Sequence, residues 1–241
     1  MKRFYNETGV AAAENGGWQV LLDGKPMRTP AKSVLVVPTK ALAEAIAEEW
    51  RAVPEKAEIN VSHLALTRLA ATGLDRVGTQ RLKVIEDTAK YGASDLLCYR
   101  ASDPENLVKR QHQTWQPLLD WAAKKYGAEL KVVSGTTFVA QPQEALAMLT
   151  AAVAEHSDLA LSALYNLTHI AGSLVIALAV AEGHLPPDKA FEAAQLDELY
   201  QIERWGEDPI AAQRHTGIRN DIVAAARFLA LLENERLRGG R

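Results

Sequence analysis

One carboxylate lies where an apolar side chain is expected. Residues 187–205 have the spacing of an amphipathic helix, and Gly206 is placed to end it. At 3.6 residues per turn, one face of this helix is apolar except for a single glutamate: Phe191, Ala194, Glu198, Ile202 and Trp205. A carboxylate on such a face is costly to desolvate unless it is paired. We therefore expect Glu198 either to meet an internal cation or to serve another molecule.

The sequence allows three roles for Glu198: a member of an internal ion pair, an anchor of a protein-binding surface, or a general base. Its neighbour Asp197 points about 100° away on a helix, so the two carboxylates cannot act jointly on one bond. We expect Asp197 to lie in a solvated row with Gln201 and Arg204. Glu198 then forms an ion pair with an arginine such as Arg68, or anchors a protein-binding surface. The alternative is a small-molecule hydrolase or lyase with Glu198 as general base, its pKa raised by apolar surroundings.

The sequence contains no recognised pattern for nucleotide, metal or serine-hydrolase chemistry, so we expect no cofactor and no metal. The six histidines form no ligand spacing typical of a metal site. His169 is predicted to be a hydrogen-bonded core residue. Cys98 is the only cysteine, and buried structural cysteines are far commoner than catalytic thiols.

Composition excludes several classes of partner. The 241 residues are 48% hydrophobic and 24% charged with a net charge of -3, as in an ordinary soluble globular protein. This charge gives no reason to expect binding to nucleic acid or to an anionic membrane. The first residues carry no apolar signal segment, and a single cysteine fits a reducing compartment. These features predict a bacterial cytoplasmic protein, or one already processed.

The elements that position these residues predict an α+β fold. Residues 1–77 form a small β-rich N-terminal domain with one or two helices, and residues 78–241 form a larger, mainly α-helical domain. The first domain contains strands at 18–22 and 33–37 and a hairpin turn at Asp23-Gly24. It also contains a helix at 41–51 capped by Thr39, and a helix at about 62–74. Two short extended pieces are expected at 96–99 and 130–133. The predicted helices of the second domain are 79–95, 104–126, 142–156, 158–182, 187–205 and 208–236.

The helix predicted at 158–182 contains an unbroken apolar run from Leu174 to Ala181. A membrane span needs about 20 apolar residues, and a polar stripe that includes Ser162 and Ser173 interrupts this segment. We therefore interpret it as a buried central helix and expect no stable membrane insertion.

Several blocks of sequence resemble one chaperone family, in the same order and spacing over nearly the whole chain. The family is the assembly chaperone that delivers the α subunit to the catalytic head, the F1 sector, of ATP synthase. The blocks are Gly17–Pro26, Thr29-Pro30, Pro38–Ala43 with Glu49-Trp50, Leu66–Leu69, Asp95–Arg100, Trp115–Ala122 and, most specifically, Asp197–Gly206.

The resemblance implies a non-enzymatic chaperone that covers an interface of newly made α subunit until the β subunit replaces it. It also implies a small β-rich domain followed by a multihelical one. Relatives in eukaryotes act in the mitochondrial matrix. The acidic block is implicated in binding the partner, and Glu198 is the first position to carry over. The other predicted contact residues are Asp197, Tyr200, Ile202, Trp205, Phe191 and, more weakly, Glu203.

Overall fold

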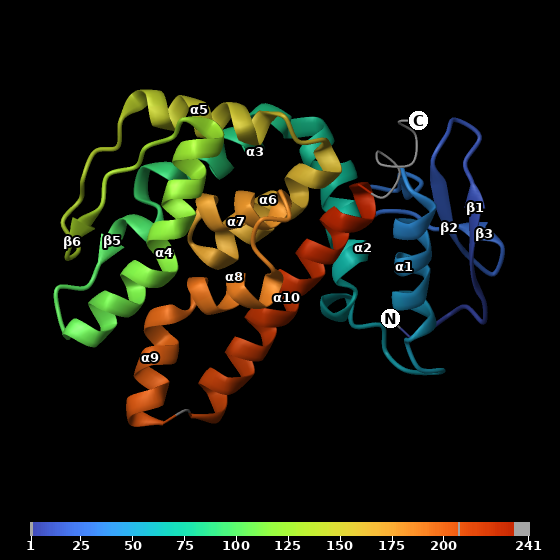
Figure 1. Ribbon diagram of the computed structural model, residues 1–241. Coiled ribbons are helices and arrows are strands. Elements are labelled where there is room, and N and C mark those ends of the chain that lie inside the picture. The colour runs from blue at the N-terminus through green and yellow to red at the C-terminus, as the bar shows by residue number, and fades with distance from the viewer. Residues whose placement is uncertain (1, 207, 234–241) are drawn as a thin grey trace. The chain divides into compact units, whose positions relative to one another are not determined.

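The computed structural model describes residues 2–206 and 208–233, and the chain divides into two compact units (Figure 1). The N-terminal unit comprises residues 1–81, 158–163 and 224–241, and the helical unit comprises residues 82–157 and 164–223. A small sheet followed by many helices confirms the predicted α+β class. The division into domains at residue 77 stays a prediction.

The sheet of the N-terminal unit is antiparallel, with β2 (Trp18–Leu22) in the middle. Along one edge of β2 lies β1 (Thr8–Ala12), and on the other side lie β3 (Lys25–Pro26) and β4 (Val36–Val37). The predicted turn at Asp23 and Gly24 joins β2 to β3, and both residues have positive φ. The strand predicted at 33–37 is confirmed only at its end, because Val34 forms just an isolated bridge.

Helix α1 (Lys40–Arg51) packs against this sheet, with Leu42 and Ile46 fully buried. Thr39 caps the helix as predicted, because its hydroxyl oxygen accepts the N–H of Leu42 at 3.1 Å.

The single helix predicted at 62–74 is instead a series of shorter elements. The structure has the 3-10 turn η1 (Val61–His63), helix α2 (Ala65–Thr72) and the π-helical turn η2 (Gly73–Val77). The carboxylate of Glu49 on α1 accepts the N–H groups of Leu66 and Thr67 in the first turn of α2. This contact satisfies N–H groups that a helix start leaves without partners.

The first part of the helical unit follows the predicted order. Helix α3 (Gly78–Ala89) leads into the 3-10 turns η3 (Lys90–Ser94) and η4 (Leu96–Cys98). The extended pieces predicted at 96–99 and 130–133 are only partly correct. The parallel pair is formed by β5 (Tyr99–Arg100) and β6 (Val133–Ser134). Helices α4 (Glu105–Tyr126) and α5 (Gln143–Ala154) agree with prediction.

The long helix predicted at 158–182 is wrong, since two helices occupy this segment. Helix α6 (Asp158–Ala171) ends at Gly172, which has a left-handed φ of 63°. Ser173 then caps α7 (Leu174–Ala181) by accepting the N–H of Ile176 at 3.0 Å. Every residue of α7 is buried, as expected of a central helix. Among the helices described, none is both long and apolar enough to cross a membrane.

The prediction of one helix over 187–205 is also wrong. Helix α8 (Pro187–Ala194) and helix α9 (Leu196–Trp205) are separated by Gln195, whose φ and ψ are −109° and 18°. Trp115 donates its indole N–H to the carbonyl of Ala193 at 2.8 Å, which engages one of the last carbonyls of α8. Helix α10 (Pro209–Glu233) follows, and the predicted continuation to residue 236 lies outside the described residues.

A candidate protein-binding site on α9 and α10

Glu198 is held by two residues of α10. Arg214 donates to its Oε1, and Nε2 of His215 lies 2.6 Å from its Oε2. The side chain of Glu198 is 40% exposed, whereas His215 is 6% exposed. The hydrogen bonds from His215 and Arg214 hold the pKa of Glu198 below its usual value, although partial burial opposes this shift. Glu198 therefore carries a negative charge at neutral pH and is half-exposed.

The sequence left open whether Glu198 pairs with an internal cation or serves another molecule, and this arrangement answers part of that question. Glu198 does have an internal cation, but Arg214 provides it from the helix that follows. Arg68 belongs to the N-terminal unit, so its pairing with Glu198 stays a prediction. The lowered pKa of Glu198 is also the opposite of the shift that suits a general base at neutral pH.

Glu198 lies at a shallow hollow of about 230 Å³, which we call the α9–α10 hollow. Among the described residues, its charged lining consists of Glu198, Asp208, Arg214 and His215, and its apolar lining includes Ile202 and Trp205. The Trp205 side chain is 76% exposed at the end of α9. Ile210, at the start of α10, is 81% exposed. Apolar and charged groups therefore occur together near the turn between the two helices.

Three other predicted contact residues attach α9 to α4. Asp197 accepts a hydrogen bond from Nε2 of Gln111 at 2.7 Å, so its predicted solvated row with Gln201 and Arg204 is wrong. The Tyr200 hydroxyl donates to Oδ1 of Asn106 at 2.7 Å. Arg110 donates to both oxygens of Glu203, at 2.8 and 2.7 Å. These residues position α9 and leave Glu198, Ile202 and Trp205 facing the α9–α10 hollow.

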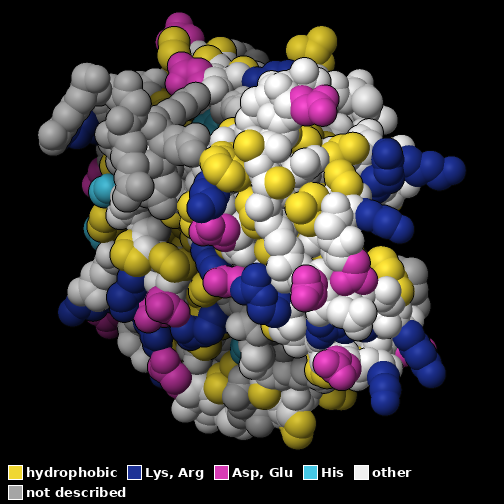
Figure 2. All heavy atoms as spheres, turned by 90° about the vertical axis from the view of Figure 1, so that its right-hand side faces the viewer, with side chains coloured by type: hydrophobic (Ala, Val, Ile, Leu, Met, Phe, Trp, Pro, Cys, Tyr) yellow, Lys and Arg dark blue, Asp and Glu magenta, His cyan; other side chains and the backbone are white. Residues whose placement is uncertain are grey.

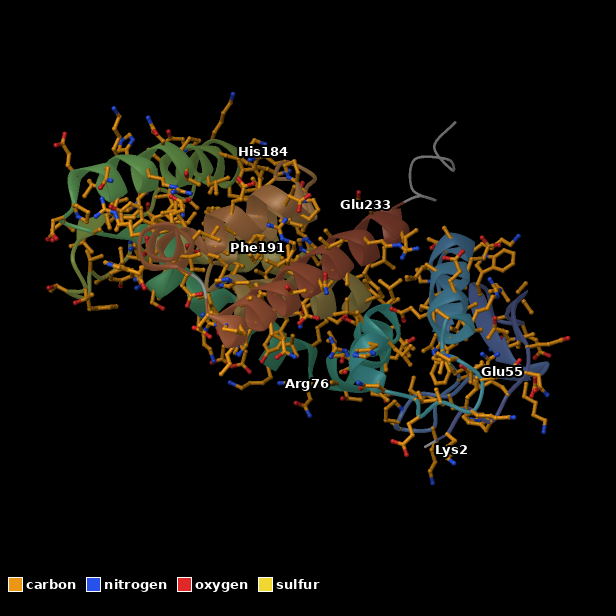
Figure 3. The ribbon with its side chains drawn as sticks, turned by 90° about the horizontal axis from the view of Figure 1, so that it is seen from below. Lys2, Glu55, Arg76, His184, Phe191 and Glu233 are labelled. Carbon is orange, nitrogen blue, oxygen red and sulfur yellow. The ribbon has the colours of Figure 1, made fainter. Side chains whose placement is uncertain are left out.

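Phe191 is buried, with 3% exposure, inside the helical unit (Figure 3). Its ring meets the ring of His215 edge-to-face at a centroid distance of 6.1 Å. The guanidinium of Arg219 lies 4.3 Å from the centre of the same ring. Phe191 therefore supports His215 and does not share an exposed apolar face with Trp205, because the helix break at Gln195 separates them.

Cys98 and His169 are the other side chains that the sequence raised as candidates for catalysis or metal binding. Cys98 is fully buried, and desolvation raises the pKa of its thiol to about 12, so the reactive thiolate is suppressed. His169 is exposed and lies 2.6 Å from the hydroxyl of Tyr91, so the prediction of a core histidine is wrong. Within the described residues, no cluster of three or more His, Cys, Asp or Glu side chains is arranged to bind a metal ion.

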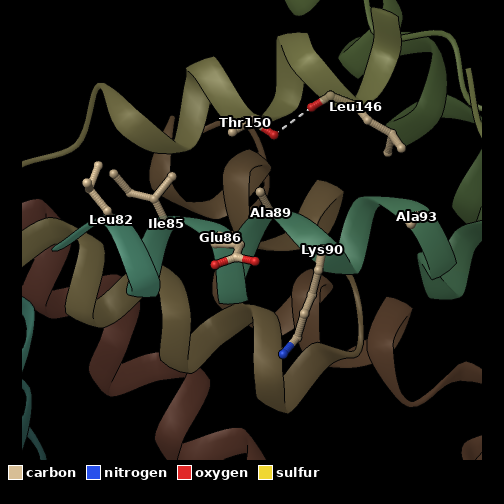
Figure 4. Close-up of a pocket in the computed structure, with 8 residues that line it drawn as sticks. All are labelled: Leu82, Ile85, Glu86, Ala89, Lys90, Ala93, Leu146 and Thr150. Atoms are coloured by element: carbon tan, nitrogen blue, oxygen red, sulfur yellow. Dashed lines mark hydrogen bonds between the residues drawn. The ribbon is translucent and has the colours of Figure 1, made fainter. Parts of the chain in front are cut away.

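A second hollow of about 360 Å³ lies between α3, η3 and α5 (Figure 4). It is mainly apolar, with Leu82, Ile85 and Ala89 on one side and Leu146 on the other. Leu82 is 82% exposed. In the part of the chain that the structure describes, two charged residues line this hollow, Glu86 and Lys90. Leu82 is therefore an exposed apolar side chain outside the α9–α10 hollow, and it can serve as a control for Trp205.

The family model described as ATP12 chaperone protein matches residues 2–123. Atp12 from Paracoccus denitrificans is 40% identical, with a TM-score of 0.88 over 96% of this chain and 98% of that one. The Atu1473 protein from Agrobacterium tumefaciens is 42% identical, with a TM-score of 0.90 over 96% of this chain and 86% of that one.

The mitochondrial protein atp12 from Schizosaccharomyces pombe is 23% identical over 223 residues, which are 85% of this chain and 74% of the relative. The family model ends before α9 and α10, so it assigns no role to residues there. It nevertheless covers half of the chain, and the structures agree over nearly all of it. The resemblance found in the sequence is confirmed, and no comparison supports a hydrolase or lyase. The chain belongs to the ATP12 chaperone family, and its function is that of an assembly chaperone for ATP synthase.

Proposed function

We propose that this chaperone holds the free α subunit of the F1 sector and that the α9–α10 hollow is its contact site. The observation that carries the proposal is the 76% exposure of Trp205 beside a charged hollow. Tryptophan is enriched among the residues that dominate binding at protein interfaces. An unassembled subunit exposes apolar surface that aggregates, and an apolar contact with Trp205 and Ile210 covers part of such a surface.

Glu198 orients the client in this proposal. Its partner Arg214 is 57% exposed, so a cationic side chain of the client can replace Arg214 at the carboxylate. Exposed ion pairs contribute little net stability, so this exchange costs little. His215 is buried beneath and keeps Glu198 in place during the exchange. Electrostatic contacts of this kind set orientation and association rate more than affinity.

The α subunit leaves by competition with β, and the chaperone itself is not an enzyme. The low pKa of Glu198 and the buried, protonated Cys98 both argue against catalysis by the groups that the sequence highlighted. The bacterial relatives of known structure are 40–42% identical, which supports action in a bacterial cytoplasm.

Co-expression with the α subunit of the same ATP synthase tests the proposal. We expect soluble α in a complex with the chaperone, and release of α when β is added. Trp205→Ser is expected to reduce soluble α strongly while the purified chaperone keeps its unfolding midpoint. Leu82→Ser is the matched control, because it removes an equally exposed apolar side chain from the other hollow.

Glu198→Gln is expected to weaken the rescue of α and to leave the chaperone folded. Equal loss of soluble α in Trp205→Ser and Leu82→Ser would show that the α9–α10 hollow is not the contact. An α subunit that stays insoluble with the unaltered chaperone would exclude α as the client.

A further inference from the structure

Strand β1 forms an edge of the sheet, and the backbone polar groups of three of its five residues point away from the sheet. The register pairs Gly9 with Leu21 and Val10 with Val20. At the ends of the ladder, Asp23 donates its N–H to the Glu7 carbonyl and Ala13 donates to Gly17, each at 3.0 Å. Antiparallel pairs alternate between bonded and non-bonded positions. The N–H and C=O groups of Thr8, Val10 and Ala12 therefore lie on the outer side of β1.

These groups have no hydrogen-bond partner within residues 2–206 and 208–233. Native proteins usually protect such an edge with lysine, proline or a bulge. The strand Thr8-Gly9-Val10-Ala11-Ala12 contains no lysine, no proline and no charge. Its first four residues are partly exposed and Ala12 is exposed. The edge is therefore open to pairing with another extended backbone.

The two faces of β1 differ in the side chains they present. Val10 lies opposite Val20, which is fully buried, so this face belongs to the core. Gly9 and Ala11 lie on the other face, where small side chains leave room above the strand. A bulky side chain on an added strand can occupy that space, because directly opposed residues pack against each other.

The charge around the edge indicates the chemistry of the added strand. From Phe4 to Gly24 the chain contains three acidic residues, Glu7, Glu14 and Asp23, and no lysine or arginine. Arg3 is a cation bonded to this segment, and it donates to the Asn6 carbonyl at 2.9 Å. Asp23 accepts the N–H groups of Asn6 and Glu7 at 2.9 and 2.8 Å, whereas Glu7 and Glu14 are exposed at the two ends of β1. Figure 2 looks onto the side that carries this sheet and shows hydrophobic side chains over its middle, with charged ones around them.

We propose that β1 is a docking edge to which an extended segment of the client α subunit adds as a further strand. The segment is uncharged in its middle and carries lysine or arginine near its ends, opposite Glu7 and Glu14. Backbone hydrogen bonds to Thr8, Val10 and Ala12 provide the attachment, as in other cases of strand addition. This inference rests on the proposed function for the identity of the client. It uses a different surface from the α9–α10 hollow.

Hydrogen exchange of the backbone amides tests the contact directly. In the free chaperone, the amides of Val10 and Ala12 are expected to exchange faster than those of Gly9 and Ala11, which bond to β2. On binding α, the exchange of Val10 and Ala12 is expected to slow by at least about tenfold. If the complex forms and these two amides still exchange as in the free protein, the docking edge is wrong and the chaperone function stands.

A matched pair of variants tests the same contact by affinity. Val10→Pro removes an N–H that the β1–β2 ladder does not use, and Val10→Thr keeps that N–H on a residue suited to strands. We expect Val10→Pro to weaken binding of α by about tenfold and Val10→Thr to bind like the unaltered chain. Equal affinities of the two variants for α would overturn the proposal.

Thermal unfolding of Val10→Pro decides whether the variant keeps its fold. Should it unfold, the exchange experiment on the unaltered chain still decides the question. Protection of Val10 that rises with chaperone concentration in the absence of α would overturn the proposal, because a second copy would then occupy the edge. Failure of the unaltered chaperone to bind α in any form would overturn both this inference and the proposed function.

Discussion

Helices α7 and α9 belong to the same unit but are fixed by different forces. All eight residues of α7 are buried, and the carboxylate of Asp95 accepts the Val175 N–H at 3.1 Å near its start. In α9 only Leu196 and Tyr200 are buried, and polar contacts to α4 and α10 hold the rest. Burial of apolar area stabilises far more than exposed ion pairs do. The unit therefore gains its stability at α7 and leaves α9 free to present apolar side chains.

The largest expected effect is at the buried helix. Leu178→Ala removes a fully buried side chain and is expected to lower the free energy of unfolding by about 2–5 kcal/mol. Ile202→Ala on α9 is the control, and we expect a loss below about 1 kcal/mol because Ile202 is half-exposed. Urea unfolding of both variants measures the difference. Equal losses would show that α9 is packed as tightly as α7.

The next effect tests the buried amide that joins α4 to α9. Gln111 is 1% exposed, and its side chain accepts the Ala101 N–H at 2.8 Å and donates to Asp197. Gln111→Leu leaves both partners unsatisfied and is expected to cost about 1–3 kcal/mol in urea unfolding. Gln116→Leu is matched to it, because the Gln116 side chain donates to Asp120 at the surface, and should change stability by less than about 0.5 kcal/mol.

A smaller effect depends on pH at Glu198. Because the pKa of Glu198 is lower in the folded protein, its contacts stabilise the fold above the unfolded pKa of about 4.3. This contribution is lost as the pH falls through the lower folded pKa. Glu198→Gln is therefore expected to be less stable by under about 1 kcal/mol at pH 7 and indistinguishable in strong acid. Unfolding curves from pH 7 to pH 2.5 check this, and a gap that widens in acid would contradict it.

The smallest effect is at the exposed ion pair between Arg110 and Glu203, whose side chains are 39% and 56% exposed. Arg110→Ala is expected to lower the free energy of unfolding by about 0.2–1 kcal/mol at low ionic strength. The difference should shrink in 1 M salt, because screening weakens exposed pairs. Thermal unfolding at two salt concentrations measures both values. A loss that is unchanged by salt would mean that Arg110 stabilises α9 through packing.

Local signals in the sequence were sufficient to predict elements that depend on neighbouring residues. The cap at Thr39 and the turn at Asp23-Gly24 follow from chemistry within a few positions. The break between α6 and α7 also has a local signal, since a glycine followed by a capping serine ends one helix and starts another. The prediction of one helix instead assigns Ser173 to a polar stripe along a continuous helix, so it misses the cap before the apolar run.

The candidate site was predictable only in part. Glu198 stands out because the other residues on its predicted helix face are apolar, and the acidic block carries the family resemblance. Its partners Arg214 and His215 lie 16 and 17 residues later. Their approach depends on how α10 folds back on α9, which no local pattern specifies. Phe191 is buried and not on the predicted exposed face, because the helix breaks at Gln195. Near this break Trp115, a residue distant in the sequence, donates to the Ala193 carbonyl.

Gly206 has a consequence for how this chain tolerates change. Its φ and ψ are 86° and 163°, a region open almost only to glycine. A Cβ added there would meet no atom of the described residues within 4 Å, its chain neighbours apart. A survey of all single substitutions would therefore find position 206 intolerant although it is exposed. Its constraint lies in the backbone alone. If the proposed contact holds, substitutions at Trp205 or Ile210 change which client surface is bound, while Gly206 keeps the backbone geometry of the turn beside them.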